Sequence, residues 1–289
     1  MFACLQLLPP QPRALLRKPL PPQLTRIDCP GSAPFFRLEA RCRRGAPDWE
    51  SIEQTAGRLR TKMLFPEGVA PPPPPPEPCS PARAQLEPGL RAFVPKRLPL
   101  LLCLRTAQQV LRASRVPPQN LRVTLVDTKG LLCRCLEPLV PLAGSLRVFT
   151  PDFAAYRGVA AQLQSRWGVT LILSDSVGCF AQSDIVVADD LSLFTGRERG
   201  LIFTPDPSPL PGCRVVRCGR PQLPESCACL CPEGIGPLLF AGALYELCGM
   251  KEMERLRFGS FSFDGVSEAW SLTDLSAMLD ASSSMIRAN

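Results

Sequence analysis

The sequence contains no histidine among its 289 residues. Histidine is the usual general base near neutral pH and the commonest metal-binding side chain in proteins. Its absence excludes Ser-His-Asp and Cys-His nucleophilic catalysis, together with the zinc sites that use imidazole ligands. An enzyme built from this chain would have to rely on lysine, tyrosine or carboxylates. The composition therefore lowers the expectation of catalysis.

Aromatic residues and long apolar runs are also scarce. Aromatics make up 7% of the chain, so the core must rely on Leu, Val, Ala and Cys. No apolar run approaches the roughly 20 residues that a membrane-spanning helix needs. The apolar segment Met1–Leu8 is followed at once by two prolines and has no leader-like charge or cleavage pattern. We therefore expect no membrane partner and a cytoplasmic location, where the fourteen cysteines would stay reduced.

The positive charge is unevenly distributed along the chain. Residues 1–120 hold 18 Lys and Arg against 8 Asp and Glu, and residues 121–289 hold 15 against 18, which together give the net charge of +7. Scattered arginines carry the excess, with no long basic run and no aromatic–basic stripe. The sequence therefore does not favour a nucleic-acid partner.

Proline is abundant, at 34 residues, which is about twice the usual share of ~5%. The hexaproline Pro71–Pro76 favours the extended polyproline II conformation, either as an exposed spacer or as a ligand for a proline-binding module. We expect a small α+β region over 1–68, a proline-rich linker or loop over 69–97, an α/β domain over 98–258 and a C-terminal tail over 259–289.

Six short β-rich stretches predict a buried parallel sheet. Short apolar runs separated by helix-like segments are typical of sheets that are covered on both faces. The fold class that we expect is α/β, a Rossmann-like parallel sheet of five or six strands flanked by helices, preceded by a smaller proline-rich α+β region. The first two strands should be parallel neighbours. The expected strands are Arg122–Asp127, Leu146–Phe149, Thr170–Leu173, Ile185–Ala188, Leu201–Phe203 and Arg214–Val216.

Outside the expected sheet, periodicity predicts one further strand and several helices. Alternation over Phe35–Cys42 is typical of a half-buried strand. Asp48 can cap a helix whose apolar face includes Trp49, Ile52, Ala56, Leu59 and Met63. Three more helical segments are expected, at Leu98–Ser114, Gly236–Phe258 and Leu272–Leu279.

The first strand–helix turn lacks the glycines that bind a dinucleotide. A Gly-x-Gly-x-x-Gly turn lets the backbone approach the pyrophosphate, but here only Gly130 is present, followed by Leu131 and Leu132. The second turn is better formed, because Thr150 can cap a helix, Pro151 suits its first position and Asp152 complements the helix dipole.

The segment Ser183–Ala188, with the sequence Ser-Asp-Ile-Val-Val-Ala, is similar to the strand entry of the shikimate-dehydrogenase-like and glutamyl-tRNA-reductase-like cofactor domains. This resemblance implies a Rossmann topology and NAD(P) as a possible cofactor. Asp152 follows Gly130 by 22 positions, close to where the ribose-binding acid of that family falls. Lys129 is the basic residue placed to meet a phosphate at the first turn. The candidate cofactor-binding residues are therefore Asp127, Lys129, Gly130 and Asp152.

Several acids lie at or just after strand ends, where ligands dock on such a sheet. They are Asp127, Asp152, Asp175, Asp189 and Asp190. A cluster of carboxylates could hold Mg²⁺, which prefers oxygen ligands. The alternative is that each acid caps a following helix or loop.

A dense group of cysteines, Cys227, Cys229 and Cys231, lies downstream of Cys213 and Cys218. Thiolate metal sites usually use Cys-x-x-Cys pairs, whereas one-residue gaps place alternate thiols on one side of an extended chain. We therefore expect no bound metal here.

Two functions remain open from the sequence. The first is a non-catalytic or degenerate Rossmann-like protein that acts in binding or regulation, with a protein as its partner. The alternative is an NAD(P)-dependent oxidoreductase, or another nucleotide-using enzyme, with an atypical phosphate loop. They differ in whether the Asp127–Gly130 turn can host a phosphate. No catalytic residue is assigned.

Overall fold

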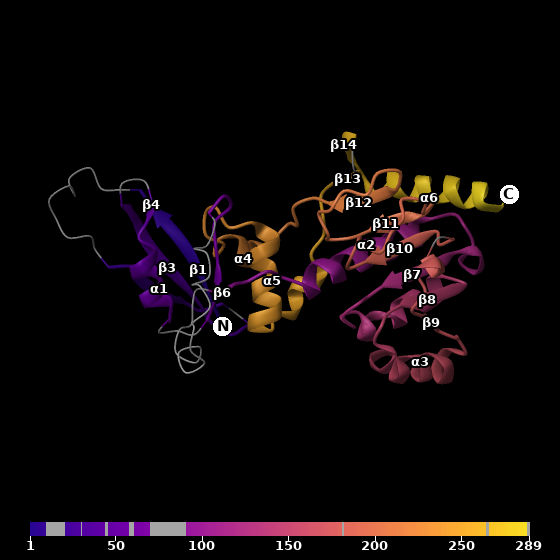
Figure 1. Cartoon of the computed structure of the whole chain (residues 1–289), viewed down its shortest axis with the longest axis horizontal. Helices are drawn as coiled ribbons and strands as arrows, with labels where there is room; N and C mark the ends of the chain where they lie inside the picture. The colour runs from indigo at the N-terminus through magenta and orange to yellow at the C-terminus, as the bar shows by residue number, and fades with distance from the viewer. Residues whose placement is uncertain are drawn as a thin grey trace, which may run out of the picture. The chain divides into compact units, whose positions relative to one another are not determined.

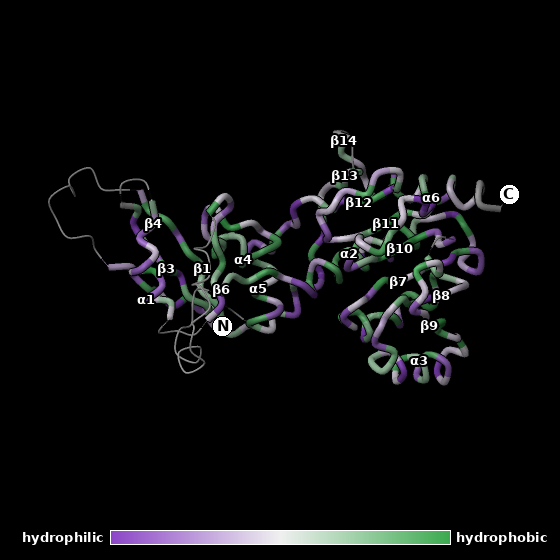
Figure 2. The backbone as a smooth tube through the Cα atoms, in the orientation of Figure 1, coloured by the Kyte–Doolittle hydropathy of each residue, from purple (hydrophilic) through white to green (hydrophobic). Residues whose placement is uncertain are grey.

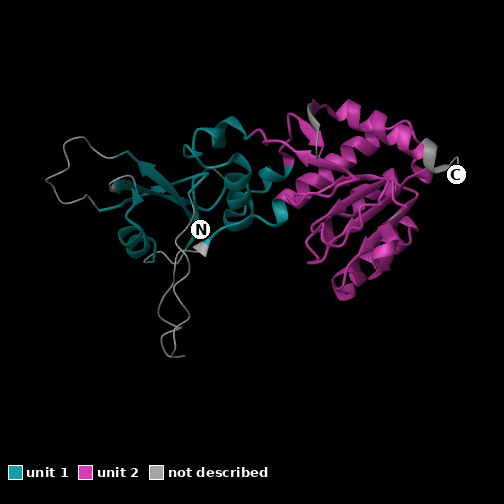
Figure 3. Cartoon of the chain, turned by 45° about the horizontal axis from the view of Figure 1, so that its top comes forward, with its two compact units in different colours: residues 1–98, 223–254 teal, residues 99–222, 255–289 magenta. Residues whose placement is uncertain are grey.

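The protein forms two compact units (Figure 3). Unit 1 comprises 1–98 and 223–254, and unit 2 comprises 99–222 and 255–289. The structure is a computed structural model that describes residues 1–9, 21–29, 31–43, 46–57, 61–69, 91–180, 182–263 and 266–287.

The units differ from the expected domain boundaries because both are discontinuous in sequence. Residues 223–254 belong with the N-terminal unit, and the expected tail from 259 onward belongs with unit 2. The expected linker over 69–97 includes a short strand and the start of a helix, while the hexaproline lies outside the described residues.

Unit 1 is built on a mixed sheet of six strands. Their bounds are β1 Phe2–Leu8, β2 Gln23–Ile27, β3 Phe35–Arg43, β4 Ala46–Pro47, β5 Lys62–Leu64 and β6 Arg91–Ala92. The strand order is β2-β3-β1-β5-β6, and β4 pairs with β3. Strand β1 pairs in parallel with both β3 and β5, and its first four residues are fully buried or nearly so. The apolar start of the sequence is thus a central strand, which sequence reasoning did not identify.

The core of unit 1 packs helix α1 (Trp49–Gly57) onto this sheet. Asp48 accepts hydrogen bonds from the N–H and hydroxyl of Ser51, as the capping prediction required. The predicted helix was too long, because Met63 lies on β5 rather than on the helix. The buried cluster comprises Ala3, Leu5, Leu38, Ala40, Ile52, Ala56 and Met63.

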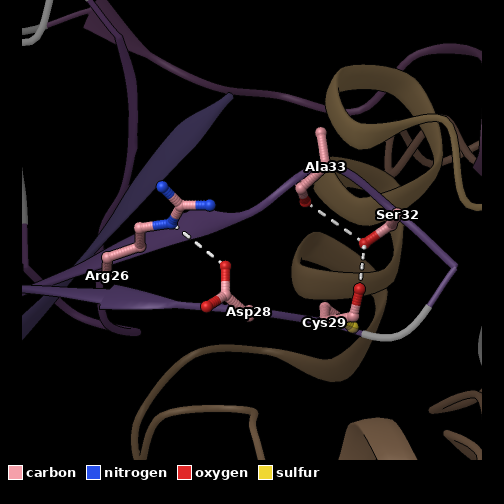
Figure 4. A network of polar contacts seen from close by, with 5 residues as sticks. All are labelled: Arg26, Asp28, Cys29, Ser32 and Ala33. Carbon is pink, nitrogen blue, oxygen red and sulfur yellow. Dashed lines mark hydrogen bonds and ion pairs between the residues drawn. The ribbon is translucent and has the colours of Figure 1, made fainter.

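The segment between β2 and β3 is held by short-range polar contacts (Figure 4). Arg26 Nε donates to Asp28 Oδ1 at 3.0 Å, and Ser32 Oγ donates to the carbonyls of Cys29 and Ala33. The C-terminal part of unit 1 adds helices α4 (Glu225–Ala228) and α5 (Pro237–Cys248). Helix α5 ends earlier than predicted because Gly249 adopts the left-handed conformation, with φ of 75°.

Unit 2 contains an eight-stranded sheet. Its strands are β7 Arg122–Val126, β8 Ser145–Phe149, β9 Ile172–Ser174, β10 Ile185–Ala188, β11 Leu201–Phe203, β12 Arg214–Cys218, β13 Phe261–Phe263 and β14 Val266–Trp270. The order is β14-β13-β12-β11-β10-β7-β8-β9. Strands β7 to β12 run parallel, and β13 and β14 add antiparallel strands. All six predicted strands are confirmed, and β7 and β8 are parallel neighbours.

Counted from β7, the six parallel strands lie in the order 3-2-1-4-5-6, which is the Rossmann arrangement. Unit 2 also contains three α-helices among the described residues: α2 (Arg97–Ala113), α3 (Phe153–Trp167) and α6 (Leu272–Arg287). Figure 1 shows α3 at the β9 end of the sheet and α6 near β12. Helix α6 is longer than the predicted Leu272–Leu279. No helix in the described residues has the length and hydrophobicity that crossing a membrane requires.

One face of this sheet is covered by loops. The strand register aligns Val126 with Phe149 and Ala188, and Ile202 with Val186 and Val215. These side chains form one buried cluster, to which the segments after β9, β10 and β11 contribute Phe180, Leu191, Phe194 and Leu210. Figure 2 shows the central strands as hydrophobic. The loops that leave the carboxyl ends of the strands are therefore anchored in the core.

Candidate functional site

The carboxyl ends of β7 and β10 form the point where the strand order of unit 2 reverses. Sheets of this kind bind ligands in the crevice at that point. Asp127 directly follows β7, and Asp189 directly follows β10. The backbone of both residues continues the hydrogen bonding of the sheet, because the Asp127 N–H donates to Phe149 O and the Asp189 N–H donates to Val126 O. Two carboxylates thus stand at the place where a ligand would be expected.

The Asp127 carboxylate is buried and is surrounded by the turn that follows β7. Its side chain is fully buried. Oδ1 accepts a hydrogen bond from the Leu131 N–H at 2.9 Å, and Oδ2 accepts one from the Leu132 N–H at 2.7 Å. Gly130, at φ of 67°, supplies the left-handed residue that folds the turn back onto the carboxylate. The backbone donors that a phosphate loop would present to a ligand point here to the protein's own carboxylate.

Tyr156 on α3 completes this arrangement. Its hydroxyl donates to Asp127 Oδ2 at 2.5 Å, and its ring is fully buried. Burial and the charge of Asp127 raise the pKa of Tyr156, so the phenol remains the proton donor. Sequence analysis did not find this partner. The available signal was a tyrosine on the apolar side of a helix, because a buried tyrosine hydroxyl usually needs a polar partner.

Asp189 connects the loop after β10 to the loop after β7. Its carboxylate accepts hydrogen bonds from the Thr128 N–H at 3.2 and 3.1 Å and from the Thr128 hydroxyl at 2.7 Å. Burial raises the pKa of Asp189, although the hydrogen bonds from Thr128 oppose that shift. The carboxylate thus serves as an acceptor for the neighbouring loop.

Further acids at this edge cap their own loops or neighbouring ones. Asp152 caps α3 in place of the predicted Thr150, by accepting a hydrogen bond from the Ala155 N–H at 3.2 Å. Asp190 accepts one from the Ser192 N–H at 2.8 Å. Asp206 accepts from the N–H groups of Leu191 and Ser208, both at 2.9 Å. These contacts support the capping interpretation of the acids. In the described part of the chain, no three Cys, Asp or Glu side chains are arranged to hold a metal ion.

Glu198, in the loop between β10 and β11, is a second buried carboxylate that accepts hydrogen bonds from backbone N–H groups. Sequence analysis did not identify it. Glu198 is 5% exposed, and its carboxylate accepts hydrogen bonds at 3.0 Å from the N–H groups of Thr195, Gly196 and Arg197. The Cys213 thiol also donates to it, at 3.3 Å. Burial alone would raise the pKa of Glu198, but its backbone and side-chain hydrogen bonds hold it below the usual range.

The four predicted cofactor-binding residues lie in different environments. Asp127 is buried, Lys129 is exposed on the same turn, and Asp152 is exposed at the start of α3. A Cβ on Gly130 would lie 3.3 Å from the Ala155 Cβ, so α3 closely approaches the turn. A pyrophosphate at this turn would need the two N–H groups that Asp127 already engages, and it would face a buried negative charge. The residues as arranged here do not fit that group.

The motif that carries the family resemblance lies at the opposite, amino edge of the sheet. Asp184 accepts hydrogen bonds from the Arg122 N–H at 2.8 Å and from the Ser283 hydroxyl at 2.9 Å. The hydroxyls of Ser183 and Thr124 lie 2.6 Å apart. These contacts join β7, β10 and α6, so the Ser-Asp pair has a structural role.

The dense cysteine group adopts a helical turn, and its interpretation as an extended chain was wrong. Cys227 lies on α4 and is buried, Cys229 is exposed, and Cys231 is half-buried. The N–H of Cys231 donates to Cys227 O, which closes the turn. Burial raises the pKa of Cys231 to about 11. The three thiols therefore point into different environments.

Comparison with known proteins gives remote structural similarity alone. No protein-family model and no curated protein matches the sequence. Among solved structures, quinate dehydrogenase from Corynebacterium glutamicum in complex with NAD is similar to 76% of this chain and 87% of its own, with 13% identity and a TM-score of 0.29. At that score the similarity transfers neither ligand nor activity.

The sequence and the strand topology together classify unit 2. It keeps the strand order of the Rossmann fold but has only one of the three glycines of the dinucleotide-binding turn. Unit 2 is therefore a degenerate Rossmann-like domain.

Proposed function

We propose that this protein is a non-catalytic, Rossmann-like binding or regulatory module whose partner is another protein. The observation that carries the proposal is the buried Asp127 carboxylate, which engages the Leu131 and Leu132 N–H groups and the Tyr156 hydroxyl. A carboxylate is an anion with the same hydrogen-bonding preference as a phosphate oxygen. The protein's own side chain thus takes the donors on which a dinucleotide site depends.

Displacing Asp127 in favour of a phosphate would be unfavourable. Hydrogen bonds to a charged group contribute about 1.5–3 kcal/mol each, and a buried charge that loses its partners costs more. A bound phosphate would also bring a second negative charge to the same turn. Lys129 is the nearby cation, but it is exposed, where charge interactions are screened by solvent.

The rest of the carboxyl edge supports a protein partner. The Thr128–Asp189 hydrogen bond links the loops after β7 and β10, and the Leu191–Asp206 hydrogen bond links the loops after β10 and β11. We expect loops linked in this way to keep the same backbone conformation when a partner binds. Pre-organised surfaces of this kind typically dock proteins with little backbone movement.

The alternative function is an NAD(P)-dependent oxidoreductase or another nucleotide-using enzyme. It is favoured by the strand order of unit 2 and by the exposed Lys129 beside the switch point. That enzyme would require the turn after β7 to rearrange and release its two N–H groups from Asp127.

Thermal-shift measurements with NAD⁺, NADP⁺, ATP and S-adenosylmethionine separate the two functions. A ligand that binds only the folded protein raises its melting temperature in proportion to the logarithm of its concentration over Kd. We expect no shift with any of the four compounds. Stabilisation of several degrees by one of them, lost in Lys129→Ala and retained in Arg134→Ala, would establish the alternative. Arg134 is a suitable control because it is an exposed basic residue close by in sequence.

A further inference from the structure

Two cysteines of unit 2 that are far apart in sequence lie close together in space. Cys103 is on α2 and Cys218 is the last residue of β12. Their sulfur atoms are 4.0 Å apart, although 115 positions separate them in the chain. A disulfide has a sulfur–sulfur distance of about 2.0 Å, so the two atoms need to approach by roughly 2 Å.

The two thiols differ in their access to solvent. Cys103 is 2% exposed, whereas Cys218 is half-buried at the carboxyl end of its strand. The hydrogen bond with Cys218 and burial raise the pKa of Cys103, while the Arg217 guanidinium opposes the shift. Cys103 is thus the member of the pair that is shielded from solvent. A reagent from solution can reach Cys218 first.

We propose that Cys103 and Cys218 are a redox-active dithiol that closes to an intramolecular disulfide when the protein meets a low-molecular-weight disulfide such as oxidised glutathione. The Cys218 thiol loses its proton, and its thiolate attacks one glutathione sulfur and expels glutathione thiolate. Cys103 then loses its proton and attacks the Cys218 sulfur of the mixed disulfide, expelling the second glutathione. Two protein thiols are oxidised by two electrons, and one oxidised glutathione yields two reduced molecules.

Closure of this bond would fasten α2 to β12. It would cross-link a loop of more than one hundred residues, and a cross-link across a long loop strongly restricts the unfolded chain. Oxidation should therefore raise the melting temperature of unit 2. The proposal does not depend on the function proposed above, because neither cysteine belongs to the Asp127 turn.

Peptide mapping of the full-length protein tests this proposal. The reduced protein is incubated with oxidised glutathione, its remaining thiols are alkylated under denaturing conditions, and the proteolytic peptides are analysed by mass spectrometry. We expect a linked peptide pair that contains Cys103 and Cys218, which reduction separates. In Cys103→Ala, we expect Cys218 to keep a stable glutathione adduct, because the resolving thiol is absent.

A matched variant controls for general thiol reactivity. Cys229 is exposed, so Cys229→Ala should lose its own adduct and leave the Cys103–Cys218 linkage unchanged. The proposal is wrong if wild-type protein carries glutathione on Cys229 while Cys103 and Cys218 are both recovered alkylated. It is also wrong if Cys218 is linked mainly to another cysteine. The wild-type map decides both points even if a variant fails to fold.

Discussion

Replacing Asp127 by asparagine should destabilise unit 2 through the turn after β7. Asparagine keeps the shape of the side chain but has one acceptor oxygen instead of two. The less damaging orientation places that oxygen at the Oδ2 position, where it can still accept from the Leu132 N–H and Tyr156 hydroxyl. The new NH₂ group then faces the Leu131 N–H, so two donors oppose each other.

The magnitude follows from these contacts. One hydrogen bond to a charged group is lost, at about 1.5–3 kcal/mol, and the two remaining bonds lose their charge assistance. Relief of the buried charge offsets part of this loss. We expect a net destabilisation of about 2–4 kcal/mol, which corresponds to a fall in melting temperature of roughly 5–15 °C for a domain of this size.

Differential scanning calorimetry measures this change, with Asp175→Asn as the matched control. Asp175 also follows a strand of the sheet but is exposed. Its substitution should stay within about 0.5 kcal/mol of wild type. If Asp127→Asn has the same melting temperature as the wild-type protein, the carboxylate does not stabilise the turn. The argument that this carboxylate excludes a bound phosphate then fails.

Three further predictions follow from the same contacts. Tyr156→Phe removes one charge-assisted hydrogen bond from Asp127 and should cost about 1.5–3 kcal/mol in calorimetry, with less than additive loss when combined with Asp127→Asn. Hydrogen bonds hold the pKa values of Glu198 and Asp206 below those of the unfolded chain, against an opposing effect of burial. The stability they contribute is thus present above pH ~4 and lost as the pH falls through the folded-state values. Melting temperatures should fall between pH 6 and pH 3, and a flat profile would contradict this. Burial and the hydrogen bond to Glu198 raise the pKa of Cys213 to about 11, so iodoacetamide at pH 7.5 should modify exposed Cys229 well before Cys213, as mass spectrometry would show.

The strands of unit 2 could be predicted because each is a short apolar run with a local signature. The prediction that β7 and β8 are parallel neighbours is confirmed, because short buried runs separated by helix-like segments are typical of a parallel sheet. The antiparallel strands β13 and β14 were not predicted. Their segment contains exposed and polar residues, so the sequence analysis assigned it to a C-terminal tail. The central position of β1 was missed for another reason: its apolar segment is adjacent to prolines, and its partners β3 and β5 lie 30 or more residues away.

The candidate site could be predicted only in part. The acids at the strand ends follow from the order of the elements, and capping by Asp152 is local in sequence. The bond between Asp127 and Tyr156 joins residues 29 positions apart, so no local pattern reveals it. The turn that lacks the glycines folds instead so that the Leu131 and Leu132 N–H groups donate to the Asp127 carboxylate.

The most direct test of this account is a titration of isotopically labelled protein with NAD⁺, followed through the amide resonances of Leu131 and Leu132. These two N–H groups donate to Asp127 and are the donors that a bound pyrophosphate would need. The account predicts that both resonances stay in place up to millimolar NAD⁺ and shift in Asp127→Asn without ligand. A saturable shift of both resonances in the wild-type protein, caused by NAD⁺, would contradict it.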